Sequence, residues 1–332
     1  MRTPAREVSW TSGQWVRKWL LTLLSFDMHL RIAALRGWLH CALRGVPNHV
    51  RVNIQTAFPE RDLSDIDRIA RSSCEHSKRV YLSRVLPGLP GSNLPKKWPV
   101  VGLAHLDAAL ERGRGVLLIT AHFGYGHIIP NALAVHGYEV ARVLAELRRP
   151  EARESLEAWL ARGSIFRRRF YARIRRLAEP LGPDDMVANL DIRPIIERLS
   201  RNGIVMTTGD GLRSSQFSNL PLLGSMYPFP NGFMKIAMLT DASVLPTYAV
   251  QDGRAGRIRV EIHPALPVDP QLDVEENLRL IGESLEEQVR QRPHLWTRWI
   301  IPNWFQVARE WSRDDGKDRY KTELKQRVSE LR

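Results

Sequence analysis

The sequence predicts an α/β fold, in which a mixed central sheet is flanked by helices and preceded by a helical N-terminal segment. Two observations support this prediction. Short apolar runs with strand character alternate with amphipathic segments of helical period through the middle of the chain. The chain has 332 residues, 43% of them hydrophobic and 26% charged, so it can bury one large core.

Residues 10–86 have the pattern of consecutive helices, with breaks at Gly45-Val-Pro47 and Phe58-Pro59. Residues 63–67 are expected to cap the last of these helices. No uncharged run approaches the roughly 20 residues of a membrane-spanning helix. At 100° per residue, an apolar stripe nevertheless forms on the first helix, and it consists of Trp15, Trp19, Leu23, Phe26 and Leu30. Residues 1–45 are therefore predicted to be amphipathic helices that lie in a membrane interface.

Tryptophan is concentrated at both ends of the chain. One group is Trp10, Trp15, Trp19 and Trp38, and the other is Trp296, Trp299, Trp304 and Trp311. Tryptophan favours surfaces with one apolar and one wet side, although the C-terminal group could equally pack on the core. We assign residues 46–312 to the main domain and the strongly charged residues 313–332 to a helix or tail.

Strands and helices alternate within the main domain. The predicted strands are Gly115–Ala121, Glu139–Leu144, Gly203–Thr208, Val244–Val250 and Arg257–Ile262, and helices are expected from Pro130, over Arg193–Arg201 and over Glu275–Arg290. In α/β sheets, ligands gather at the carboxyl ends of the strands. The residues that follow these strands are therefore the first candidates for a functional site.

The charge of the chain indicates an anionic partner. A net charge of +13 fits nucleic acid, an anionic membrane surface, or an acidic carrier protein or substrate. Residues 142–176 hold eleven arginines and four glutamates, a net charge of +7, which favours a substrate or lipid headgroup. Nucleic acid is not expected, because no helix-turn-helix or finger spacing occurs. Cys41 and Cys74 lack metal-type spacing and fit a reducing compartment.

The first candidate site is His122-Phe-Gly-Tyr-Gly-His127, which follows a buried strand. The glycines let a substrate approach the backbone, and a histidine placed there can act as a general base. Alternatively, His122 is a structural side chain satisfied by backbone hydrogen bonds. A metal site at His122 and His127 is not expected, because residues five apart on a helix do not share a face.

A second candidate segment, Thr207-Thr-Gly-Asp210-Gly-Leu-Arg213, follows another predicted strand. We expect the two strand ends to converge on one cleft, which would bring Asp210 and Arg213 towards His122. Alternatively, Asp210 could simply form a turn together with its neighbours Gly209 and Gly211.

Four segments, taken in order, resemble a known family. They are Asn53-Ile-Gln-Thr-Ala-Phe-Pro-Glu60, the strand ending Ile-Thr-Ala-His122-Phe-Gly, Leu223-Gly-Ser-Met-Tyr-Pro-Phe-Pro-Asn-Gly232, and Ala242-Ser-Val-Leu-Pro246. The chain resembles the late acyltransferases of lipid A biosynthesis, which belong to the lysophospholipid acyltransferase superfamily and include mycobacterial phosphatidylinositol mannoside acyltransferases. The similarity runs from about Asn53 to about Trp304.

The resemblance implies transfer of a fatty acyl group from acyl carrier protein or coenzyme A to a hydroxyl of a lipid or glycolipid. It implies a peripheral protein on the cytoplasmic face of the inner membrane, with no cofactor besides the thioester. His122 takes the role of the base. The family's acidic residue five positions later is His127 here, which leaves three alternatives: a working His-His pair, recruitment of another carboxylate such as Asp210, or a degenerate protein that binds lipid or carrier without turnover.

The resemblance and the motif also suggest substrate-binding positions. These are Gly124 and Tyr125 in the turn, Arg148 and Arg149 near a lipid or phosphate, Arg213, and Ser225, which stands where mycobacterial relatives carry a glutamate. The N–H groups of the Gly124–Gly126 turn and of the following helix start are candidate oxyanion donors.

Overall fold

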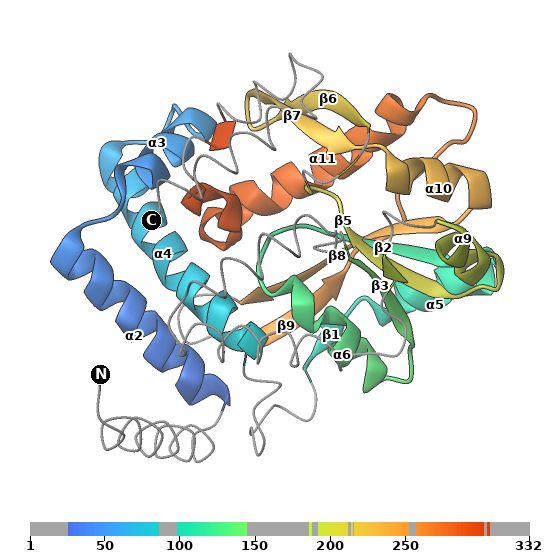
Figure 1. Cartoon of the computed structure of the whole chain (residues 1–332), viewed down its shortest axis with the longest axis horizontal. Coiled ribbons are helices and arrows are strands. Elements are labelled where there is room, and N and C mark those ends of the chain that lie inside the picture. The colour runs from blue at the N-terminus through green and yellow to red at the C-terminus, as the bar shows by residue number, and fades with distance from the viewer. Residues whose placement is uncertain are drawn as a thin grey trace, which may run out of the picture.

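The computed structural model describes residues 26–85, 98–144, 186–187, 192–211, 214, 216–251, 257–301 and 304–305. A mixed sheet forms its centre, and helices cover both faces (Figure 1). The predicted fold class is confirmed. Several predicted features lie outside the described residues, namely Arg148, Arg149, Arg213, residues 1–25 and residues 313–332.

The sheet has seven strands in the order β1-β9-β8-β2-β5-β3-β4, and all neighbours are parallel except β8 and β9. The strands are β1 (Val100–Val101), β2 (Val116–Thr120), β3 (Val140–Leu144), β4 (Met186–Val187), β5 (Ile204–Thr208), β8 (Ser243–Gln251) and β9 (Ile258–Ile262). The five strands expected from the sequence are all present. β1 and β4 were not predicted, because two residues give no readable alternation.

Strand β2 is buried along its whole length and serves two cores. Leu117 and Ile119 pack on one face with residues of α3 (Asn48–Ala57), α4 (Leu63–Val85), α9 (Arg193–Ser200), α10 (Gly232–Thr240) and α11 (Val274–Gln291). Val116 and Leu118 pack on the other face with α5 (Leu103–Glu111) and α6 (Ile129–Ala134). A strand that is covered on both faces has a continuous apolar run in its sequence, and this explains why β2 could be predicted from the sequence.

The N-terminal helices break where the sequence predicted. α2 (Phe26–Arg44) ends before Gly45, and α3 ends before Phe58. The cap of α4 lies one residue earlier than expected, because the Asp62 carboxylate accepts a hydrogen bond of 2.7 Å from the backbone N–H of Asp65. No helix within the described residues combines the length and the apolar character needed to cross a membrane.

The predicted membrane-facing stripe is wrong for its two described members. Phe26 and Leu30 are buried, and the Phe26 ring meets Trp98 edge-to-face at 6.0 Å. They face inward because α2 packs along α4 with this side (Figure 1). The opposite side of α2 is exposed and also apolar.

Three of the four C-terminal tryptophans pack on the core rather than on an interface, and the fourth, Trp311, lies outside the described residues. Trp296, Trp299 and Trp304 are buried, on or beside the two short turns η3 (Pro293–Leu295) and η4 (Thr297–Ile300). A hairpin of β6 (Phe217–Leu222) and β7 (Ser225–Pro230) covers the same core. The sequence did not reveal this hairpin, because three prolines interrupt its strand pattern.

Candidate active site

The register of the sheet brings His122 and Asp210 together. β2 and β5 are parallel, with Thr120 paired to Thr208, and the Gly209 N–H extends the pairing by donating 2.7 Å to the Thr120 carbonyl. His122 and Asp210 each come two residues after this last pair, and Nδ1 of His122 lies 2.7 Å from Oδ1 of Asp210. The expected convergence of the two strand ends is therefore observed.

Asp210 is completely buried, and its carboxylate lies among hydrogen-bond donors and the guanidinium of Arg298. Its Oδ1 also accepts 2.9 Å from the His122 backbone N–H, and its Oδ2 accepts 3.1 Å from Trp296 Nε1. Burial raises the pKa of Asp210, but His122 and the Arg298 guanidinium outweigh it and hold that pKa well below its usual range. Asp210 is therefore an ionised hydrogen-bond acceptor.

This pairing favours one tautomer of His122. An ionised carboxylate can only accept, so the contact with Asp210 favours the form with the hydrogen on Nδ1 and the lone pair on Nε2. The side chain of His122 is 32% exposed while Asp210 is closed off from solvent. The arrangement can take a proton at Nε2 and stabilise the resulting imidazolium from behind.

The segment before and along η4 holds the backbone at His122 in place. The N–H and the Oγ1 of Thr297 each donate 2.9 Å to the His122 carbonyl. An isolated bridge joins Phe123 to Trp296. The site is thus assembled from three segments far apart in sequence: the ends of β2 and β5, and the η3–η4 turns.

The glycine-rich turn packs against the protein's own backbone and leaves no room there for a substrate. Gly124 has φ +59°, and a Cβ there would lie 2.0 Å from the Ala249 carbonyl oxygen. Gly124 and Tyr125 already donate their N–H groups to Leu295 and Ala249, which corrects their prediction as oxyanion donors. The Tyr125 ring is fully buried, and its hydroxyl donates 2.9 Å to Gln251, so the predicted contact with substrate is wrong.

His127 is not the partner of His122. Its Nε2 lies 3.0 Å from the Ser83 hydroxyl on α4, and Asp210 occupies the Nδ1 side of the His122 ring. Of the three alternatives left open by the sequence, the geometry matches recruitment of Asp210. Asp210 therefore does more than form a turn.

Ser225 does not join the pair. It opens β7 opposite Leu222, and no hydrogen bond among the described residues connects it to His122 or Asp210. The residue of β7 that reaches the site is Tyr227, whose hydroxyl donates 2.8 Å to the Asp210 carbonyl.

Two residues that contact the imidazole or the carboxylate of the pair were missed in the sequence. Trp296 bonds the carboxylate, as described above, and Nη2 of Arg298 lies 2.9 Å from Nδ1 of His122 and donates 2.8 Å to the Asp210 carbonyl. The guanidinium also lies over the Trp304 ring, 4.6 Å from its centroid. The only signal in the sequence was an arginine within the C-terminal tryptophan cluster. Because that cluster was interpreted as an interface or as core packing, Arg298 was not considered as a site residue.

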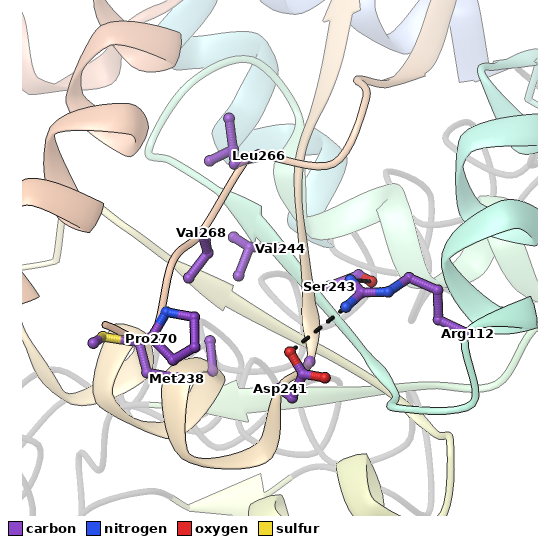
Figure 2. A pocket seen from close by; sticks show the side chains of 10 residues that line it. Arg112, Met238, Asp241, Ser243, Val244, Leu266, Val268 and Pro270 are labelled. Atoms are coloured by element: carbon purple, nitrogen blue, oxygen red, sulfur yellow. Dashed lines mark hydrogen bonds and ion pairs between the residues drawn. The ribbon is translucent and has the colours of Figure 1, made fainter. Parts of the chain in front are cut away.

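A separate cavity lies at the amino ends of the strands, opposite to the His122–Asp210 pair. It has a volume of about 30 Å³, room for about one water molecule, beside Arg112, Asp241 and Ser243 (Figure 2). Ser243 pairs with Val116, the first residue of β2, whereas His122 follows the last. The cavity is therefore remote from the His122–Asp210 pair. Among the described residues, no three His, Cys, Asp or Glu side chains gather as a metal site.

Fold and site together define an α/β protein in which a partly exposed histidine, paired with a buried carboxylate, lies at the carboxyl ends of the sheet strands. A profile of the family described as bacterial lipid A biosynthesis acyltransferase matches residues 13–306. The chain belongs to this family and is an acyltransferase.

Two curated relatives cover nearly the whole chain. A lipid A biosynthesis acyltransferase of Haemophilus influenzae is 26% identical over 321 residues, which is 93% of this chain and 90% of the relative. A phosphatidylinositol mannoside acyltransferase of Mycobacterium tuberculosis is 24% identical over 312 residues, 91% of this chain and 92% of the relative.

Proposed function

We propose that this chain transfers a fatty acyl group from the thioester of acyl carrier protein or coenzyme A to a hydroxyl of a lipid or glycolipid. Nε2 of His122 takes the hydroxyl proton as the oxygen attacks the thioester carbonyl. The C–S bond then breaks, and the imidazolium returns the proton to the leaving thiolate. Asp210 holds the ring and stabilises its charged form. The observation that carries this proposal is the 2.7 Å contact between Nδ1 of His122 and the buried Asp210 carboxylate.

The acceptor class follows from the relatives. One relative's name places it in lipid A biosynthesis, and the other names phosphatidylinositol mannoside. We extend to this chain only what both names share, acyl transfer in the synthesis of a lipid. The alternative of a degenerate binding protein is disfavoured, because Asp210 supplies the carboxylate that His127 lacks.

The test is a comparison of His122→Ala with the wild-type protein, using acyl carrier protein and coenzyme A thioesters and a lipid extract. We expect transfer to fall by about 10²- to 10⁴-fold, the usual contribution of a general base. His105→Ala, which removes an exposed histidine of α5, should leave transfer unchanged. Equal rates for His122→Ala and wild type would remove His122 from the mechanism.

We further propose that the protein binds peripherally to an anionic membrane, at the cytoplasmic face of the inner membrane, through the outer side of α2. Five exposed side chains lie there within about 80° at 100° per residue: Met28, Ile32, Leu35, Leu39 and Leu43. Trp38 lies beside them and is also exposed. Arg31 and Arg36 flank the stripe on its two sides, so their charges can reach phosphate groups while the apolar side chains enter the lipid.

A groove of about 290 Å³ continues this face between α2 and α4 and is lined by Ala34, Leu35, Trp38 and Glu75. A lipid surface is a better occupant than a second copy of the chain, because two copies of net charge +13 repel each other. An anionic surface attracts the same charge.

Sedimentation with vesicles tests this surface. Leu35→Glu/Leu39→Glu should weaken binding to phosphatidylcholine–phosphatidylglycerol vesicles at least tenfold, since each leucine loses an apolar burial of about 1.5 kcal/mol or more. Leu239→Glu on α10, which is 72% exposed, is the matched control and should bind as wild type. Unchanged vesicle binding by the double variant would refute this surface, and a change only in oligomeric state would assign it to a second copy.

A further inference from the structure

A cation stands directly behind the proposed base. Arg298 comes from η4, and its side chain is only 11% exposed. Its Nη2 lies 2.9 Å from Nδ1 of His122, and its Nε lies 3.4 Å from Oδ2 of Asp210. The stacking on Trp304 and the bond to the Asp210 carbonyl leave the guanidinium little freedom to move.

Asp210 and Arg298 compete for the same ring nitrogen. A neutral imidazole carries one hydrogen, on Nδ1 or on Nε2. With the hydrogen on Nδ1, the ring bonds Asp210 at 2.7 Å and Nε2 can accept a proton. With the hydrogen on Nε2, Nδ1 accepts from Arg298 and the ring cannot act as a base through Nε2.

The two side chains also act oppositely on the charge of the ring. A buried carboxylate in contact with Nδ1 favours the imidazolium, which has already taken its proton and is useless as a base. The guanidinium at 2.9 Å from the same nitrogen disfavours the imidazolium. Among the described residues, Asp210 after β5 and Arg298 on η4 are the charged groups in contact with this ring, while Tyr227 on β7 reaches the Asp210 carbonyl.

We propose that Arg298 is a positioning residue that keeps His122 in its neutral, proton-accepting form by offsetting the charge of Asp210. Arg298 also pairs with the carboxylate, so Asp210 stays ionised and continues to direct the hydrogen to Nδ1. The pair therefore orients the ring without protonating it in advance. This inference rests on the proposed role of His122 as the base, but its main measurement does not require turnover.

The experiment is an NMR titration of the His122 ring in the full chain, with wild type, Arg298→Gln and Arg298→Lys. Removing the charge in Arg298→Gln should move protonation of His122 to a pH higher by about one unit or more. Arg298→Lys keeps the charge and should titrate close to wild type. The acid limb of the pH–rate profile should move in the same direction, with activity partly recovered at high pH.

Arg298→Gln leaves a buried carboxylate without its cation and could fail to fold. The comparison is therefore repeated between Asp210→Asn and Asp210→Asn/Arg298→Gln, in which no unpaired carboxylate remains. The double variant should again protonate at the higher pH. An identical titration with and without Arg298, in a folded protein, would reduce Arg298 to a structural role. If His122→Ala is fully active while the titration shifts, the proposed function fails but the effect of Arg298 on the ring stands.

Discussion

Asp210 contacts His122 twice through one oxygen, Oδ1, which accepts 2.7 Å from Nδ1 of the ring and 2.9 Å from the backbone N–H. One atom thus fixes both the rotation of the imidazole and the position of its backbone. The carboxylate comes from a neighbouring strand, 88 residues further along the chain. The departure at His127 therefore does not deprive His122 of an acidic partner.

Asp210→Asn should lower the rate of acyl transfer with little change in KM. An amide can donate to Nδ1 and favour the wrong tautomer, and it does not stabilise the imidazolium. In a serine protease triad the same change costs about four orders of magnitude in rate, and we expect about 10²- to 10⁴-fold here. Steady-state rates measure it.

Asp241→Asn is the matched control for that variant. Asp241 is a half-exposed carboxylate beside Arg112 and Arg114, remote from the site. Its removal should leave the rate unchanged. Full activity of Asp210→Asn would contradict the pairing as the basis of catalysis.

His127→Asp should not increase the rate, although it restores the residue type that the family resemblance leads one to expect. Nδ1 of His122 is already bonded to Asp210, and position 127 faces the Ser83 hydroxyl instead. Transfer rates of wild type, His127→Asp and His127→Asn should agree within a few-fold or show a loss common to both variants. A gain of tenfold or more in His127→Asp alone would show that a carboxylate is missing.

The convergence of the two strand ends could be predicted because apolar runs mark the strands and because ligands gather at their carboxyl ends. What places Asp210 directly opposite His122 is the pairing of Thr120 with Thr208. Register is set by packing of the whole sheet and leaves no local pattern. The sequence could therefore name both residues but could not distinguish Asp210 from His127 as the partner.

Arg298 and Trp296 could not be predicted. They lie on or beside short turns without periodicity, and Arg298 is 176 residues from His122. Tryptophans that pack on a core and tryptophans that bond a carboxylate look alike in a sequence. Tyr125 was misassigned for a related reason. A glycine-rich turn indicates that another group approaches the backbone closely, but the sequence does not tell whether that group is a substrate or, as here, Ala249.

Gly124→Ala should destabilise the protein far more than Gly224→Ala. Both glycines have positive φ, +59° and +71°, so alanine pays a similar conformational cost of about 1 kcal/mol at each. A Cβ at position 124 would lie 2.0 Å from a backbone oxygen, whereas nothing lies within 4 Å of one at position 224. Urea unfolding of both variants measures the difference. Equal losses would show that the turn can relax away from β8.

His76 should make the protein less stable as the pH falls from 7.5 to 5. This histidine of α4 is buried edge-to-face against Tyr125, 5.1 Å between ring centroids, and burial, with the charges of His294 and Arg79, lowers its pKa to about 3. The unfolded chain takes up the proton near pH 6.5, and the folded chain does not. Stability is therefore complete above pH 6.5 and is lost as the pH falls towards 3, by about 2 kcal/mol at pH 5.

The free energy of urea unfolding at pH 7.5 and pH 5 isolates this contribution when wild type is compared with His76→Gln. The variant loses the titrating ring, so its stability should fall by about 2 kcal/mol less over the same interval, whatever its stability at pH 7.5. Asp210 does not confuse the result, because a carboxyl with a lowered pKa loses stability only below about pH 4. His105→Gln, at an exposed position, should keep the wild-type slope. If the stability of wild type and of His76→Gln fell equally between pH 7.5 and pH 5, His76 would take up its proton in the folded protein. The packing of His76 against Tyr125 would then be more open to water than its burial indicates.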